Sequence, residues 1–72
     1  MLISVSVVDE IELLEKELYA KGGLRPKYLA LSKSMYTNLK EERGIPVYEE
    51  IPIYRGYFIY IIPTDEKIVK FI

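Results

Sequence analysis

The chain contains no cysteine, no histidine, no tryptophan and no glutamine. Without cysteine, neither a disulfide framework nor a thiolate metal site can form, and without histidine a zinc ion would have to be held by carboxylates alone. The usual general base and the best nucleophile of enzymes are missing as well. The sequence therefore predicts a non-enzymatic protein with no cofactor and no metal.

With 72 residues the chain has room for one small domain, residues 1–72. A domain of this length buries only about 60% of the surface that its unfolded chain exposes. Small domains compensate with crosslinks, metals, self-association or very regular packing, because one core of this size rarely supplies more than about 5 kcal/mol. Since the first two routes are closed here, self-association or very good packing is left.

Positive and negative side chains nearly cancel, at 10 against 11, so the net charge does not point to a polyanionic partner. Asn38 is the only asparagine. A composition with few thermolabile residues and much lysine and glutamate is typical of thermophiles, although an AT-rich genome also favours lysine. The start, MLISVSVV, lacks the basic residues of a secretory signal. The longest uncharged apolar run, Tyr57 to Ile62, is far shorter than the ~20 residues of a membrane helix. We expect a cytoplasmic protein that does not enter the membrane.

The first half of the chain predicts strands and helices in alternation. Apolar residues at every second position from Ile3 predict a strand in ISVSVV. A helix is predicted next, with Asp9 as its N-cap, Glu12 completing a capping box, and Gly22 ending it in the left-handed conformation. The apolar residues from Lys27 to Leu31 predict a second strand, which is expected to follow the first in parallel.

A second helix is predicted in KSMYTNLKEER, with Ser32 as its cap and Gly44 at its end. The runs IPVYEEIPIY, YFIYII and IVKFI then predict two successive antiparallel hairpins. Pro52 cannot donate to a ladder, so its strand is expected at an edge of the sheet. A four-residue loop from Tyr54 to Tyr57 is preferred to a two-residue Arg55-Gly56 loop, because it turns the missing donor outward.

The order β-α-β-α-β-β-β predicts an α+β fold, a two-layer sandwich with a mixed sheet and both helices on one face. The other face would then be lined by one alternate set of the final hairpin, either Tyr57, Ile59 and Ile61 or Phe58, Tyr60 and Ile62. Both sets are apolar, and a contiguous apolar patch on a small protein marks an interaction site. One helix on each side of the sheet would instead bury the strand twice. The preferred prediction is a self-associating protein, a homodimer first, whose interface uses Tyr54, Tyr57, Ile59 and Ile61.

A basic segment, residues 25–43, carries five cations against two glutamates. Such a segment can hold phosphates while neighbouring aromatic rings stack on bases. The alternative prediction is therefore a nucleic-acid-binding module that uses Lys27, Lys33, Lys40, Arg43 and Arg55. An ordinary solvated helix face accounts for the same pattern, and the sequence pI of about 5.4 is far from the value above ~9 that nucleic-acid-binding domains show.

Tyr36 and Lys40 have the Tyr-x-x-x-Lys spacing of the catalytic pair of short-chain dehydrogenases. The chain has neither the glycine-rich nucleotide loop nor the length of that fold, so we interpret the spacing as coincidence.

The run PKYLALSKSMYTNLKEE followed by IYRGYFIYIIP resembles a strand, helix and hairpin pattern of tailed-phage proteins, of which HK97-type major capsid proteins are the best known. The resemblance covers Pro26 to Pro63, about half of the chain. The chain lacks room for the long arm, the extended loop and the spine helix of a capsid subunit. The resemblance implies a small accessory protein of a virus or mobile element and carries no catalytic residue over.

Overall fold

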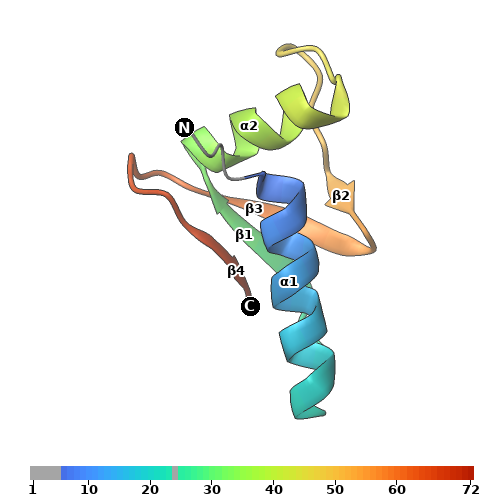
Figure 1. The fold of residues 1–72 in the computed structure, drawn as a ribbon. Helices are drawn as coiled ribbons and strands as arrows, with labels where there is room; N and C mark the ends of the chain where they lie inside the picture. The colour runs from blue at the N-terminus through green and yellow to red at the C-terminus, as the bar shows by residue number, and fades with distance from the viewer. Residues whose placement is uncertain (1–5, 24) are drawn as a thin grey trace, which may run out of the picture.

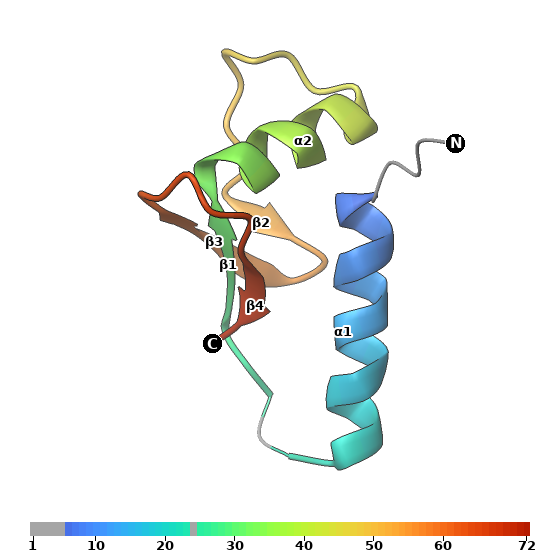
Figure 2. The ribbon, with the colours of Figure 1, turned by 60° about the vertical axis from the view of Figure 1, so that its left-hand side comes forward.

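The computed structural model describes residues 6–23 and 25–72. Its helices are α1 (Val7–Lys21) and α2 (Lys33–Arg43), and its strands are β1 (Tyr28–Ser32), β2 (Ile53–Tyr54), β3 (Tyr57–Ile62) and β4 (Val69–Phe71). The strands form one mixed sheet in the order β2-β3-β1-β4, in which only β1 and β3 are parallel. Both helices lie on the same side of this sheet (Figures 1 and 2), so the predicted α+β fold is confirmed.

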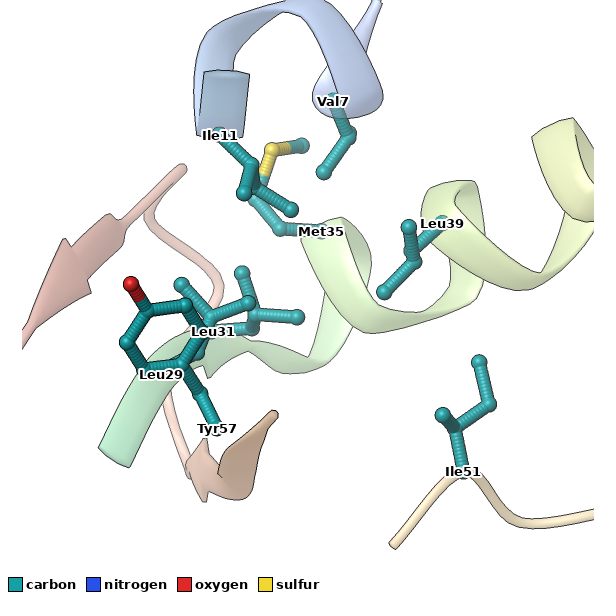
Figure 3. Close-up of a cluster of buried hydrophobic side chains, with 8 residues drawn as sticks. All are labelled: Val7, Ile11, Leu29, Leu31, Met35, Leu39, Ile51 and Tyr57. Atoms are coloured by element: carbon teal, nitrogen blue, oxygen red, sulfur yellow. The ribbon is translucent and has the colours of Figure 1, made fainter. Parts of the chain in front are cut away.

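The core lies between the helices and the sheet (Figure 3). Leu29 and Leu31 project from β1 toward the helices, where they meet Ile11 of α1 and Leu39 of α2. These four side chains are fully shielded from solvent, and each large apolar side chain buried in this way contributes about 1.5–3 kcal/mol. The cluster is completed by Val7, Met35, Ile51 and Tyr57.

Helix α1 begins earlier than predicted, with one local contact and one distant contact at its start. Its N-cap is Ser6, whose Oγ accepts a hydrogen bond from the Asp9 N–H at 3.2 Å. The Glu42 carboxylate, from the end of α2, accepts further bonds from the N–H groups of Val7 at 2.8 Å and Val8 at 3.2 Å. The predicted N-cap Asp9 is therefore wrong and lies in the first turn, where a negative charge favours the helix dipole. The predicted first strand, ISVSVV, is wrong at residues 6–8, which form the N-cap and the first residues of α1, and its residues 3–5 lie outside the described residues.

The predicted ends of the helices are confirmed. Gly22 and Gly44 end α1 and α2 with φ of 60° and 68°, a left-handed conformation that glycine adopts without steric cost. Strand β1 is shifted by one residue from its prediction. Ser32 does precede α2, but its side chain does not cap it, because its Oγ accepts a hydrogen bond from the Ile68 N–H at 3.2 Å.

Strands β2 and β3 are joined by the two-residue turn Arg55-Gly56, so the predicted four-residue loop is wrong. Both turn residues have positive φ, 53° and 86°, which matches the right-handed twist of the strands. The turn pairs Tyr54 with Tyr57. The ladder then lacks one bond: Ile59 donates to the Pro52 carbonyl at 3.1 Å, and proline has no N–H to donate in return. The edge position predicted for this strand is confirmed.

The last two strands do not form the predicted second hairpin. β1 lies between β3 and β4, and β4 pairs with β1 alone through the register Leu29↔Phe71 and Leu31↔Val69. This arrangement places Phe71 against Tyr57 on the helix side of the sheet, with ring centroids 4.7 Å apart.

Candidate functional site

The strand register divides the sheet into two faces of different character. The helix side carries Leu29, Leu31 and Tyr57, which are buried in the core. The alternate residues point to the other side, where Figure 2 shows no helix. We call this second side the open face and define it by Tyr28, Ala30, Ile53, Phe58, Tyr60, Lys70 and Ile72.

One row of apolar side chains crosses all four strands of the open face. Ile53 pairs with Phe58, Phe58 with Tyr28, and Tyr28 exchanges two backbone hydrogen bonds with Ile72, of 3.0 and 2.9 Å. All four side chains are 44–53% exposed. A residue of this kind is normal when it stands alone on a surface, but a contiguous row of them marks an interaction site.

A second row lies one step further along the strands. Tyr60 pairs with Ala30, and Ala30 pairs with Lys70. Tyr60 is half-exposed, whereas the small side chain of Ala30 is fully buried beneath its larger neighbours. Beside Tyr60 the row has no member from β2, because that strand begins at Ile53 and the preceding Ile51 turns into the core (Figure 3).

The open face carries an aromatic pair and is nearly without charge. The Tyr28 and Phe58 rings lie 5.9 Å apart with an interplanar angle of 41°, a tilted arrangement that aromatic pairs favour. Lys70, on the edge strand, is the one ionised side chain among the seven residues of the face. Depletion of charge with enrichment of tyrosine and phenylalanine is the composition of an interface centre.

The predicted interface residues lie on the other side of the sheet. Tyr57 is in the core, and Tyr54 and Ile59 are partly buried against it. Ile61 remains exposed, but it shares the helix side with Ile59. The sequence alone leaves the two alternate sets of the hairpin open, and the structure places Phe58 and Tyr60 on the open face and the preferred set on the helix side.

The feature that distinguishes the two sets is the contact of Glu15 with Arg55 and Tyr57. Glu15 is buried beside Tyr57, whose hydroxyl donates to Glu15 Oε2 at 2.8 Å, while Arg55 donates to Oε1 from Nη2 at 2.6 Å and from Nε at 3.2 Å. The carboxylate lies at the fourth residue after Ile11 on the apolar side of α1. A buried carboxylate on the apolar side of a helix needs polar partners. The turn supplies the Arg55 guanidinium, and the start of β3 supplies the Tyr57 hydroxyl.

These contacts shift the protonation of the cluster. The Arg55 guanidinium holds the pKa of Glu15 below its ordinary value, with burial opposing and the Tyr57 hydroxyl assisting. The hydroxyl of Tyr19, burial, and the Glu15 carboxylate together hold the pKa of Tyr57 well above its ordinary value. Glu15 is therefore ionised and Tyr57 protonated at neutral pH. Every partner is used inside the fold, so the cluster is a structural contact between α1 and the hairpin.

The five cations of the alternative prediction do not form one surface. Lys40 is buried, donates to the Val47 carbonyl at 2.7 Å, and lies 4.8 Å from the centre of the Tyr36 ring. Arg55 is bound to Glu15. Lys27, Lys33 and Arg43 are exposed, before β1 and at the opposite ends of α2. Two of the five predicted cations are thus engaged in internal contacts.

No family model, curated protein or solved structure matches the chain. Neither α1 nor α2 has the length and apolar character that a membrane-crossing helix needs within the described ranges.

Proposed function

We propose that this chain is a non-catalytic protein that associates with copies of itself through the open face. The observation that carries the proposal is the contiguous set of five large apolar side chains, each about half exposed, on a sheet face that neither helix covers. They are Tyr28, Ile53, Phe58, Tyr60 and Ile72.

The exposed area fits a protein partner. A large side chain has about 200 Å² of surface, so five that are half exposed offer roughly 500 Å². Stable complexes bury about 800 Å² on each partner, of which an apolar centre is one part and a polar rim the remainder. The seven residues of the open face thus supply an interface centre of the usual size.

A second copy is the simplest partner, because twofold dimers are the commonest assembly. It also supplies what a short chain lacks, since docking two open faces joins the sheets of two small domains into one larger core. A nucleic acid fits less well, because phosphates need several cations and the open face holds only Lys70. The resemblance of Pro26 to Pro63 to tailed-phage proteins supports the proposal that this assembly serves a virus or mobile element.

Sedimentation equilibrium tests the proposal. We expect a dimer with a dissociation constant at or below about 10 µM. Phe58→Glu and Tyr60→Glu, made separately, should each weaken it at least ~100-fold, because the dimer would bury an unpaired carboxylate.

Leu13→Glu is the matched control, since Leu13 is an equally exposed apolar residue on α1, on the helix side of the sheet. This variant should associate as the wild-type chain does. A monomeric wild type, or an association that the two open-face variants leave unchanged, would contradict the proposal.

A further inference from the structure

The open face has a feature that an isologous contact requires, because its first row reads the same from both ends. From β2 to β4 the row is Ile53, Phe58, Tyr28 and Ile72, an aliphatic residue, two aromatic rings and an aliphatic residue. Its midpoint lies between β3 and β1, the two central strands. A twofold axis that runs along the strands through this midpoint lays the row on its own copy in reverse order.

The second row is complementary to itself under the same rotation. Reversal places Tyr60 of one copy over Ala30 of the other, a large side chain over the smallest one of the face. It also places Lys70 of one copy over the position beside Tyr60 where β2 has no residue on the open face. Alternation of large and small residues lets two layers interdigitate, and the ammonium group keeps its water at an open rim.

We infer that the protein forms a face-to-face dimer whose twofold axis runs parallel to the strands between β1 and β3. This inference rests on the proposed self-association and adds its geometry. Phe58 packs on Tyr28 of the second copy, Ile53 on Ile72, and Tyr60 on Ala30. The sheets lie about 10 Å apart with their strands aligned to within about 30°, as in β-sandwiches. The assembly has four layers, with the helices of both copies outside.

Pairing of two copies through the edge strand β4 is disfavoured by Lys70. If two copies of β4 paired antiparallel about a twofold axis at its central residue, Lys70 would stand opposite its own copy. Like charges directly opposite across a ladder are destabilising, and lysine on an edge strand is a common device against such pairing. Pairing through β4 is therefore less favourable for two copies than packing through the open face.

A charge-complementation experiment tests which residues face each other. Ile53→Lys and Ile72→Glu each place one charge in the proposed contact, and each variant alone should dimerise at least about tenfold more weakly than the wild type, because the charge is buried without a partner. In an equimolar mixture, the introduced ammonium group of one copy meets the introduced carboxylate of the other. The mixture should recover dimers at least about tenfold, and native mass spectrometry should show them as mixed dimers.

The matched control is a mixture of Ile53→Lys with Phe58→Glu. These positions are neighbours within one sheet but lie about 10 Å apart laterally across the proposed dimer, two strand spacings, so the mixture should not recover. Phe58→Lys mixed with Tyr28→Glu is a second facing pair and should recover like the first.

The outcomes separate the geometry from the function. If the wild type is a dimer but the facing mixtures recover dimers no better than the control mixture, the assigned axis is overturned and the proposed self-association stands. A wild-type chain that stays monomeric overturns both. Recovery by both facing mixtures and not by the control establishes the geometry.

Discussion

Arg55 donates from Nη2 to Glu15 Oε1 at 2.6 Å and so ties the β2–β3 turn to α1 across 40 positions of the sequence. The same arginine holds a φ of 53°, which residues other than glycine and asparagine rarely adopt. A residue in a strained backbone conformation persists where its surroundings compensate. Here the compensation is the buried carboxylate. Three predictions concern this contact, and a fourth concerns the loop after α2.

Arg55→Gly removes the strain and the ion pair together. We expect a net loss of about 1–3 kcal/mol in the free energy of unfolding, because the buried Glu15 loses a charged partner, whereas relief of the left-handed φ returns only ~1 kcal/mol. Urea unfolding measures it. In a Glu15→Gln background the same substitution should cost about 1 kcal/mol less. A more stable Arg55→Gly variant in the otherwise wild-type chain would show that the strain outweighs the contact.

Acid should weaken the fold through Glu15. Since the folded-state pKa lies below the ordinary value of 4.5, the ionised carboxylate contributes stability above pH 4.5 that is lost as the pH falls through the lower value. The difference in unfolding free energy between wild type and Glu15→Gln should therefore shrink between about pH 7 and pH 3. The effect of pH on the other carboxylates cancels in this difference, because both chains carry them. A difference that stays unchanged over that range would contradict the account.

Alkali should weaken the fold through Tyr57. Its folded-state pKa lies above the ordinary value of 10.0, so the protonated hydroxyl contributes stability below pH 10 that is lost as the pH rises further. Relative to Tyr57→Phe, the wild-type chain should lose stability between about pH 9 and pH 11. A difference from Tyr57→Phe that stays constant over that range would contradict this account of Tyr57.

Lys40 should order the loop after α2. Its Nζ donates to the Val47 carbonyl at 2.7 Å, within a loop that also bonds Glu49 N–H to the Pro46 carbonyl at 3.0 Å. Lys40→Met keeps the stem and removes the donor, so the Glu49 amide should exchange with solvent about tenfold faster. Lys33→Met, at the exposed start of α2, is the matched control and should leave the exchange unchanged. If the Glu49 amide exchanges at the same rate in both variants, Lys40 does not order the loop.

Local chemistry explains why much of the fold could be predicted. Both helix ends follow from glycines that alone adopt positive φ freely, and β1 follows from a short apolar run after a proline. What failed depends on distant contacts. At the start of α1, the local cap Ser6 is joined by Glu42, which lies 35 residues beyond Val7, and the place of β4 is set by pairing with β1. Neither partner is visible in the local pattern.

The sequence predicts an apolar second face of the sheet, but the residues that it assigns to that face lie on the helix side. An apolar second face of the final hairpin was expected and is present, but alternation leaves two phases of equal apolar character. The phase is decided by a polar contact, because the hydroxyl of Tyr57 reaches Glu15 of α1 and so turns Phe58 and Tyr60 outward. The turn length was missed for a related reason, since Arg55 holds a left-handed conformation in a turn that is bound to Glu15 of α1.

The central claim is that the open face packs on its own copy in solution. An isotope-filtered NOE experiment on an equimolar mixture of labelled and unlabelled chain tests it most directly, because it detects only contacts between copies. The account predicts NOEs between copies that join the Phe58 ring to Tyr28 and the Ile53 methyl groups to Ile72. A dimer with such NOEs confined to residues of α1 and α2, or a chain that stays monomeric by sedimentation and shows none, would contradict it.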